Sequence, residues 1–303
     1  MNNTAIIGKK IGAREKPLNT RIESMLRKTL FSVFVILMYL GILIGLSFTI
    51  FQHTLFFYDP IILVSIPVAI GIGFVAGAIF GAQKKKDRII NGEITRHGIH
   101  TIISHWGTAF GIFALMASGI LSGFLNVPPF FSTPSMLMMA LNIHFFAILL
   151  ISLTGTFFIA DYTFSRQWLL LWPTMTDIIH GFFDNLILHH PWAKERKYLS
   201  SQKVAFLGAA VIGLVMLVTG AIKVASHVYI INANVWAWAT VIHDVFFLLM
   251  VLYLIVHVGM VLLGGHWASF ESYFTGEMSA KLAAKDYPLW YEEVKSGGNK
   301  KEA

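Results

Sequence analysis

Four histidines lie inside long apolar stretches of this sequence: His105, His144, His243 and His257. Neutral imidazole can do two kinds of chemistry in such a place, because it can ligate a metal or haem iron and it can relay protons. A single buried histidine could equally be satisfied by one structural hydrogen bond. Ionisable residues in apolar spans are rare and tend to mark function, so the arrangement of all four must decide between these roles.

The composition indicates an integral membrane protein. The chain has 303 residues, of which 56% are hydrophobic and 13% are charged, whereas soluble domains carry about 25% charged residues. The formal net charge of +7 is what basic cytoplasmic loops give a membrane protein, so it does not indicate nucleic-acid binding. The absence of cysteine excludes disulfides, iron–sulfur ligation and covalent haem attachment through CxxCH by this chain.

Six apolar runs are long enough to position the histidines within a bilayer. Each exceeds the ~20 residues that a spanning helix needs, and lipid offers the backbone no hydrogen-bond partners other than its own. The sequence therefore predicts an all-α integral membrane protein with six transmembrane helices, the last four forming a haem-binding four-helix bundle. The runs lie near residues 30–51, 61–82, 102–125, 137–160, 204–225 and 239–263.

Lysine and arginine alternate between the connections of these runs. They are present in residues 1–28, 83–101, 161–203 and 271–303, and absent from 51–60, 126–136 and 226–238. Because basic loops stay in the cytoplasm, both termini are expected there, in a multi-pass protein of the prokaryotic plasma membrane. The first run is longer than a signal-peptide core and no A-x-A-like site follows it, so we expect an uncleaved span.

This orientation sorts the four histidines into two depths. His105 and His257 lie about 3 and about 6 residues from the inner ends of their spans, and His144 and His243 about 7 and about 4 residues from the outer ends. His243 and His257 are 14 residues apart, which places them ~21 Å apart along a helix and within ~40° of one another around it. One helix thus offers a ligand at each level, which predicts two haems, each bound by two histidines.

Other histidines are weaker candidates for ligands. His100 lies ~140° around the helix from His105, so the two cannot share a haem face, and both His97 and His100 lie nearer to water. We therefore prefer His105. Five others lie in loops or just beyond span ends, where imidazole is easily solvated: His53, His189, His190, His227 and His266.

The chain divides into a cytoplasmic segment (1–28), two additional spans (29–83), a di-haem domain (92–270) and a cytoplasmic tail (271–303). Aromatic residues in the connection 161–203 indicate an interfacial helix or re-entrant segment. We expect the end, SGGNKKEA, to be disordered. Small residues in the spans let helices approach closely or leave room for a macrocycle: Gly119, Gly123, Gly208, Gly213 and Gly220.

Three stretches resemble the gamma, or cytochrome b, subunit of membrane-bound formate dehydrogenases. They are RHGIHTIISHWGTAFGIFALMASGILSGF, KYLSSQKVAF followed later by VTG, and IHDVFFLLMVLYLIVH. The likeness covers roughly residues 92–270. It extends to the wider family of di-haem b-type cytochromes, which also serves nickel–iron hydrogenases and thiosulfate or other sulfur-compound reductases.

The resemblance implies roles for particular residues. It assigns His105 and His257 to an inner b-type haem and His144 and His243 to an outer one, in agreement with the depths. It also implies a quinone site beside the inner haem, near His257, with candidates His180, Asn185, Tyr198, Gln202 and Lys203. Leu199 departs from the asparagine that family members often carry there. Arg96, Arg166 and Lys203 could pair with haem propionates or could simply be basic residues of the inner side.

The resemblance further implies an electron-transfer subunit of anaerobic respiration, with no substrate catalysis beyond quinone reduction. An outside iron–sulfur subunit, joined to a catalytic molybdenum or tungsten subunit, would deliver electrons to a membrane quinone, menaquinone. Asp244, beside His243, could orient that ligand, meet the partner or be a solvated carboxylate. The complex could be a homo-oligomer in the lipid.

Three alternatives stay open. The partner could instead be a hydrogenase, a sulfur-compound reductase or a multihaem cytochrome. A haem-free transporter could use the histidines as proton relays, but it would place them near the midplane rather than at two levels. A passive membrane anchor would give no reason for four histidines at paired depths.

Overall fold

The computed structural model describes residues 55–83, 87–124, 133–188, 195–263 and 267–299, with scattered positions between 25 and 47. The predictions for the N-terminal segment 1–28 and for a span at 30–51 therefore lie outside the continuously described residues. The loop histidines His53, His189, His190 and His266 lie outside them as well.

Five helices of the described chain are long and apolar enough to cross a membrane. They confirm the positions predicted for the second to sixth spans. The first is formed by α2 (Pro60–Leu63) and α3 (Ser65–Ala82). The next is α4 (Ile99–Gly119), which η2 (Ile120–Phe124) continues. The others are α5 (Pro134–Phe164), α7 (Ser200–Ala225) and α8 (Ala233–Leu263).

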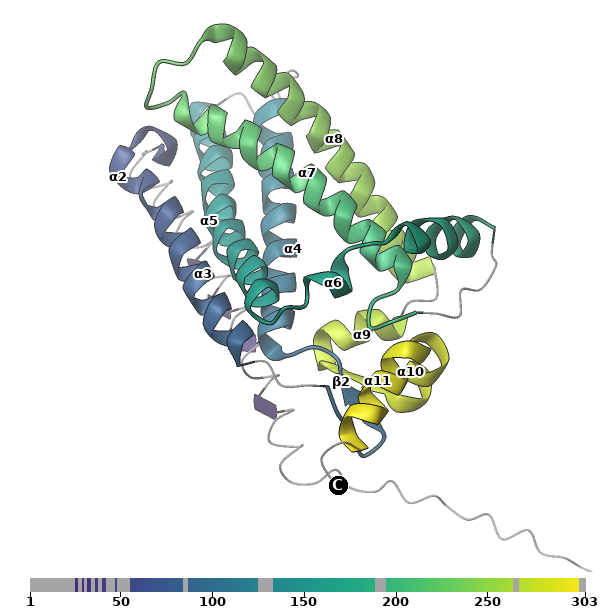
Figure 1. Ribbon diagram of the computed structural model, residues 1–303. Coiled ribbons are helices and arrows are strands. Elements are labelled where there is room, and N and C mark those ends of the chain that lie inside the picture. The colour runs from purple at the N-terminus through teal and green to yellow at the C-terminus, as the bar shows by residue number, and fades with distance from the viewer. Residues whose placement is uncertain are drawn as a thin grey trace, which may run out of the picture.

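The long helices form two antiparallel pairs (Figure 1). We call α4 and α5 the first hairpin, and α7 and α8 the second hairpin. Within each hairpin the two helices pack along their length, and α3 packs along the other side of α5. Among the described residues, the two hairpins do not run along one another at direct packing distance.

Three glycines of α3 pack directly against α5. Gly73, Gly77 and Gly81 are buried, and a Cβ at these positions would overlap the carbonyl oxygens of residues four apart on α5, namely Leu153, Phe157 and Asp161. Spacing by four residues puts all three glycines on one helix face, so the two backbones can touch. The G-x-x-x-G-x-x-x-G pattern of residues 73–81 is therefore a sequence signal for this close contact.

The connection between the hairpins lies across one end of the helices. It holds α6 (Trp168–Leu171) and the wide-turned π-helix η4 (Asp177–Ile187), which packs on α7. Large apolar side chains of this connection are exposed, among them Leu169, Trp172 and Phe183. An exposed apolar surface at the end of membrane-spanning helices agrees with the interfacial helix expected from the sequence.

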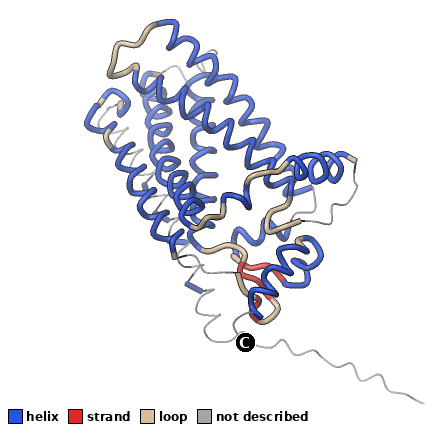
Figure 2. The backbone as a smooth tube through the Cα atoms, in the orientation of Figure 1, coloured by secondary structure: helices blue, strands red, loops and turns tan. Residues whose placement is uncertain are grey.

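The same end of the helices is covered by a folded C-terminal unit (Figures 1 and 2). It combines α9 (Trp267–Thr275), β3 (Glu277–Ser279), α10 (Ala280–Asp286) and α11 (Pro288–Asn299) with β1 (Ile89–Ile90) and β2 (Glu93–Thr95). The three strands form an antiparallel sheet in the order β1-β2-β3, in which Ile94 pairs with Met278. We call this end of the helices the cap side and the opposite end the far side.

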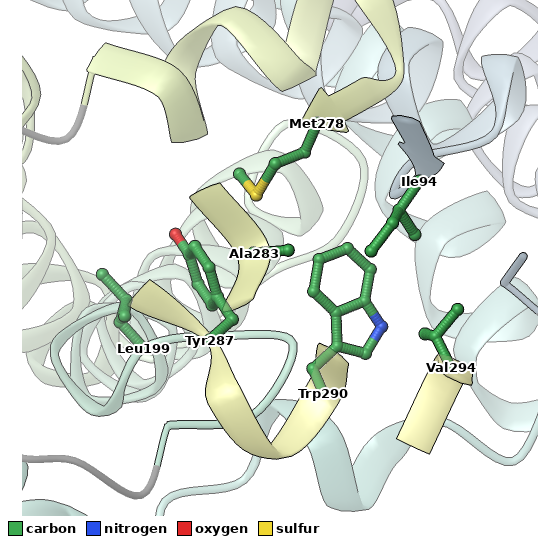
Figure 3. Close-up of a cluster of buried hydrophobic side chains, with 7 residues drawn as sticks. All are labelled: Ile94, Leu199, Met278, Ala283, Tyr287, Trp290 and Val294. Carbon is green, nitrogen blue, oxygen red and sulfur yellow. The ribbon is translucent and has the colours of Figure 1, made fainter. Parts of the chain in front are cut away.

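The C-terminal unit has its own hydrophobic core. Figure 3 shows the ring of Trp290, from α11, between Ala283 of α10 and Ile94 of β2. The seven buried residues of this core are Ile94, Leu199, Met278, Ala283, Tyr287, Trp290 and Val294. Two expectations are corrected here. A small sheet is added to the helices, and the stretch expected to be disordered is helical as far as Asn299, because Trp290 and Val294 anchor α11.

On the far side, η1 (Phe56–Tyr58) packs against α5. The backbone N–H of Phe56 donates to the side-chain oxygen of the buried Asn142, 3.1 Å away. The rings of Phe56 and Phe57 contact that of Phe145 on α5. Phe145 follows His144, so successive residues of α5 face different neighbours.

Candidate cofactor site between the two hairpins

The cap-side pair consists of His105 on α4 and His257 on α8. The two side chains are close enough to interact electrostatically, although their helices belong to different hairpins. The ring of Tyr273, from α9, stacks on His105 with 4.2 Å between centroids. The ring of Tyr253 is nearly parallel to His257 at 5.5 Å. Aromatic rings therefore border both members of this pair.

The far-side pair consists of His144 on α5 and His243 on α8. These two side chains also interact electrostatically and also come from different hairpins. The structure therefore brings the four histidines together in the two pairs that depth and helical facing predict, and α8 contributes one member to each pair.

Each far-side histidine has a hydroxyl partner within its own hairpin. The Nδ1 atom of His144 lies 2.9 Å from Oγ of Ser118 on α4. The Nδ1 atom of His243 lies 2.8 Å from Oγ1 of Thr219 on α7. Since Nδ1 is engaged in both rings, Nε2 is the nitrogen of each that is available to a further group.

Side chains bridge the two hairpins at two places. Phe158 of α5 and Phe206 of α7 meet on the cap side with 5.9 Å between ring centroids. Val224 of α7 packs against the far-side cluster around Phe145. The hairpins are farther apart than directly packed helices and are joined by apolar contacts at these two places. A flat apolar group could lie between hairpins arranged in this way.

The rival histidines face elsewhere. His100 points toward α3 and α5, since its Nε2 lies 3.6 Å from a carboxylate oxygen of Asp161 and its ring stacks on Phe80 at 5.7 Å. His97 is buried, and its ring stacks on that of Tyr273 with 4.3 Å between centroids. Tyr273 is the residue that also stacks on His105. The expectation that His100 cannot share a face with His105 agrees with these contacts.

The donor set fits haem. Neutral imidazole is a common ligand of haem iron, and a metal-ligating histidine commonly donates a hydrogen bond from its other ring N–H to a nearby acceptor. The far-side histidines have such acceptors in Ser118 and Thr219. If haem binds here, the four imidazoles would hold the iron, and the two hairpins would supply the apolar walls.

The glycines named from the sequence behave differently from one another. A Cβ at Gly220 would lie 3.4 Å from the ring of His243, and one at Gly119 would lie 3.9 Å from the ring of Phe247, so both face α8. A Cβ at Gly208 would lie 4.0 Å from Tyr253. Gly123 and Gly213 have open space around them, and close packing does not explain them.

The quinone candidates lie on the cap side, and several of them make hydrogen bonds that stabilise the fold. Tyr198 is buried and shares a 2.6 Å hydrogen bond with the hydroxyl of Tyr162. The side-chain oxygen of Gln202 caps α7 by accepting from the backbone N–H of Leu199 at 3.1 Å. His180 is exposed, and the side chain of Asn185 lies outside the described atoms.

Lys203 belongs to a buried polar network at the start of α7. Its ammonium lies 2.8 Å from a carboxylate oxygen of Asp177, which also accepts from the hydroxyl of Ser200 at 2.9 Å. Burial alone would raise the pKa of Asp177, but hydrogen bonds from Lys203, Thr174 and Ser200 outweigh it and lower that pKa to about 2. Lys203 is thereby paired with a protein carboxylate, which weakens its assignment to a haem propionate.

Glu195 completes this network from the other side of Ser200. Both carboxylate oxygens accept from the backbone N–H of Ser200, at 3.1 and 2.9 Å, at the N-terminus of α7. Burial raises the pKa of Glu195, although the hydrogen bonds from Ser200 oppose the shift. The cap side thus carries two buried carboxyl groups whose pKa values are shifted in opposite directions.

Arg96 is a structural centre that the sequence did not reveal. It is 2% exposed. Its guanidinium donates to the carbonyl of Lys197 at 2.7 Å and to the hydroxyl of Tyr287 at 3.2 Å, and it lies 4.4 Å from the centre of the Tyr287 ring. It thus joins the start of α4 to the C-terminal unit, which argues against a propionate partner. Arg166 is exposed in a turn with a φ of 57°.

The family comparison agrees with this arrangement. The model of the prokaryotic cytochrome b561 family matches residues 96–276, which is more than half of the chain and includes all four histidines. The chain belongs to this family. It is accordingly a membrane b-type cytochrome of electron transfer, and the family binds b-type haem. No curated protein matches the sequence.

Proposed function

We propose that the chain holds two b-type haems in a bundle of α4, α5, α7 and α8. His105 and His257 would ligate the cap-side haem, and His144 and His243 the far-side haem. The observation that carries this proposal is the pairing of histidines across the two hairpins at two levels of α8. A bound haem supplies reversible one-electron transfer.

The chain's own residues would set the geometry of this transfer. His243 and His257 place the two levels ~21 Å apart along α8. The apolar contacts of Phe158 with Phe206, and of Val224 with the Phe145 cluster, would exclude water beside the two histidine pairs. Ser118 and Thr219 would hold the far-side imidazoles through Nδ1.

We further propose that the cap side faces the cytoplasm, in the plasma membrane of a prokaryote, with residues 30–51 as a sixth span. The basic connections support this, because Lys and Arg recur on the cap side and are absent from the far-side connections. The exposed apolar residues of α6 and η4 would then lie at the inner membrane surface.

The role proposed for the chain is to pass electrons between an outside partner and the quinone pool. The resemblance over residues 92–270 favours the iron–sulfur subunit of a formate dehydrogenase as that partner, with menaquinone as the quinone. Hydrogenases, sulfur-compound reductases and multihaem cytochromes are alternative partners with the same role. The quinone-site candidates are His257, His180, Asn185, Tyr198, Gln202 and Lys203. Of these, Tyr198, Gln202 and Lys203 already hydrogen-bond to Tyr162, Leu199 and Asp177, so they would have to act at a quinone site from within those contacts.

The first test is a haem count on the purified chain. The protein in detergent should give a b-type α-band near ~560 nm in the dithionite-reduced minus oxidised spectrum, with two haems per chain. One haem would overturn the two-level proposal. A folded chain with none would contradict the haem proposal and favour the proton-relay transporter.

The quinone role has its own test. In proteoliposomes, a reduced menaquinone analogue should reduce the bound haem, and His180→Ala should slow that reduction without changing the haem count. Haem that quinol cannot reduce in a fully loaded protein would contradict the quinone role and leave the haem sites standing.

A further inference from the structure

The far-side histidines are held by two hydroxyl groups in equivalent places. Ser118 of α4 bonds His144 of α5, and Thr219 of α7 bonds His243 of α8. In each hairpin the hydroxyl is on the first helix and the histidine is on the second. A glycine follows each hydroxyl residue, Gly119 in one case and Gly220 in the other.

The direction of both hydrogen bonds follows from the backbone. The hydroxyl of Ser118 lies 2.6 Å from the carbonyl oxygen of Ala114, and that of Thr219 lies 2.7 Å from the carbonyl oxygen of Val215. A carbonyl oxygen can only accept, and a hydroxyl has one proton to donate. Each hydroxyl therefore gives its proton to its own helix and accepts a proton from the imidazole.

This direction selects one tautomer of each ring. The proton must lie on Nδ1, so the lone pair is on Nε2, the nitrogen suited to binding iron. Ser118 is 0% exposed and Thr219 is 5% exposed, so water does not compete for either hydroxyl. The ring of His243 lies over Gly220, where a Cβ would be 3.4 Å from the ring, an ordinary van der Waals distance.

We propose that Ser118 and Thr219 are positioning residues for the far-side haem, which rests on the haem function proposed above. They fix the orientation and tautomer of His144 and His243. By accepting Nδ1–H they make both imidazoles more basic ligands, and a more basic ligand favours the ferric over the ferrous iron. The two hydroxyls thereby lower the reduction potential of the far-side haem.

The test compares Thr219→Val, which removes the hydroxyl at nearly constant shape, with Thr219→Ser, which keeps it. Haem retention is measured by transfer to apomyoglobin, and midpoint potentials are measured by redox titration. Thr219→Val should weaken retention of one haem about 10- to 100-fold and raise its potential, while the other haem is unchanged. Thr219→Ser should behave as the wild type, and Ser118→Ala should act in the same direction as Thr219→Val.

Thr154→Val is the matched control. Thr154 is also 5% exposed and also bonds a carbonyl of its own helix, that of Leu150 at 2.9 Å. Its other partner is the hydroxyl of Thr108 at 3.0 Å instead of an imidazole. Its loss should therefore leave both potentials unchanged.

Two failures can be told apart. If the wild-type chain holds fewer than two haems, the proposed function itself fails. If the wild type holds two haems and both Thr219→Val and Ser118→Ala match it in retention and potential, the positioning role is overturned while the haem function stands. An equal shift of potential in Thr154→Val would also overturn it, because a general loss of helix packing would then explain the effect.

Discussion

The far-side pair, His144 and His243, is held by hydroxyl groups, whereas aromatic rings border the cap-side pair, His105 and His257. The two levels share α8, and each consists of two histidines from different hairpins. They differ in where the supporting groups come from, because the hydroxyls belong to the hairpins themselves and Tyr273 belongs to the C-terminal unit.

The difference separates local from long-range support. Ser118 and His144 are neighbours as soon as the first hairpin forms, and Thr219 and His243 as soon as the second forms. Tyr273 reaches His105 only after the chain has returned from α8 through α9. Damage to the C-terminal unit should therefore affect the cap-side pair and spare the far-side pair.

The largest expected effects test the pairing itself. His144→Ala or His243→Ala should remove one haem, and His105→Ala or His257→Ala should remove the other, because each iron would lose an axial ligand. Redox titration should show one remaining midpoint potential, the same within each pair and different between pairs. His100→Ala is the control and should keep both haems, since His100 faces α3 and α5.

Loss of both haems from a stably folded His144→Ala variant would contradict independent levels. Loss of a haem in His100→Ala would instead mean that His100 takes the place assigned to His105. The first result would contradict the independence of the two levels, and the second would contradict the choice of His105. The four ligand variants and the control should therefore be measured together.

The next largest effect is expected for the Arg96→Met substitution. The change leaves buried partners such as the carbonyl of Lys197 and the hydroxyl of Tyr287 without their donor, at a cost of about 3 kcal/mol or more in the free energy of unfolding. Thermal unfolding in detergent and the haem count should show lower stability and loss confined to the cap-side haem. Arg196→Met is the control, because Arg196 is 54% exposed and its ion pair with Glu293 is long, at 3.7 Å. Equal loss of both haems would show that the far-side pair also needs the C-terminal unit.

Sequence reasoning succeeded where the physics is local or periodic. Long apolar runs predict spans because lipid forces the backbone into helices. The 14-residue interval on α8 predicts two levels on one face because the helical repeat is regular. The pairing of His105 with His257 and of His144 with His243 by depth follows from those two rules together with the alternating basic connections.

The C-terminal unit could not be predicted in the same way. Its strands have two or three residues, and β2 pairs with β3 across most of the chain's length. Its core depends on Ile94 meeting Trp290 and Val294, which no local pattern reveals. The structural role of Arg96 could not be predicted for the same reason. From the sequence, a basic residue beside a span indicates only the cytoplasmic side, whereas the structure shows its hydrogen bonds to Tyr287 and Gln202.

Asp177→Asn should have a smaller, pH-dependent effect on the cap side. The folded pKa of Asp177 is lowered to about 2 from its ordinary value of 3.8, so its stabilisation is present above pH 3.8 and is lost as the pH falls toward 2. At pH 7 the variant should be less stable by about 2 kcal/mol, and the difference from wild type should shrink by pH 3. Glu293→Gln is the exposed control, since Glu293 is 52% exposed. A difference that is constant with pH would contradict an ionised Asp177 paired with Lys203.

Tyr273 gives the smallest and most specific test of the comparison. Its ring stacks on those of His97 and His105, with centroid distances of 4.3 and 4.2 Å respectively. Its carbonyl oxygen accepts from the indole N–H of Trp106 at 2.9 Å. A side-chain substitution therefore removes the stacking and leaves the backbone contact in place.

Tyr273→Leu should lose the stacking energy of about 0.5–1.5 kcal/mol, which corresponds to a few-fold faster transfer of the cap-side haem to apomyoglobin. Tyr273→Phe keeps the ring and should behave as the wild type, because the stacking does not need the hydroxyl. Ser118→Ala should produce the opposite selectivity by loosening only the far-side haem. If Tyr273→Leu and Ser118→Ala loosened the same haem, the two levels would not have separate supports, and the contrast between hydroxyls and rings would have no consequence for binding.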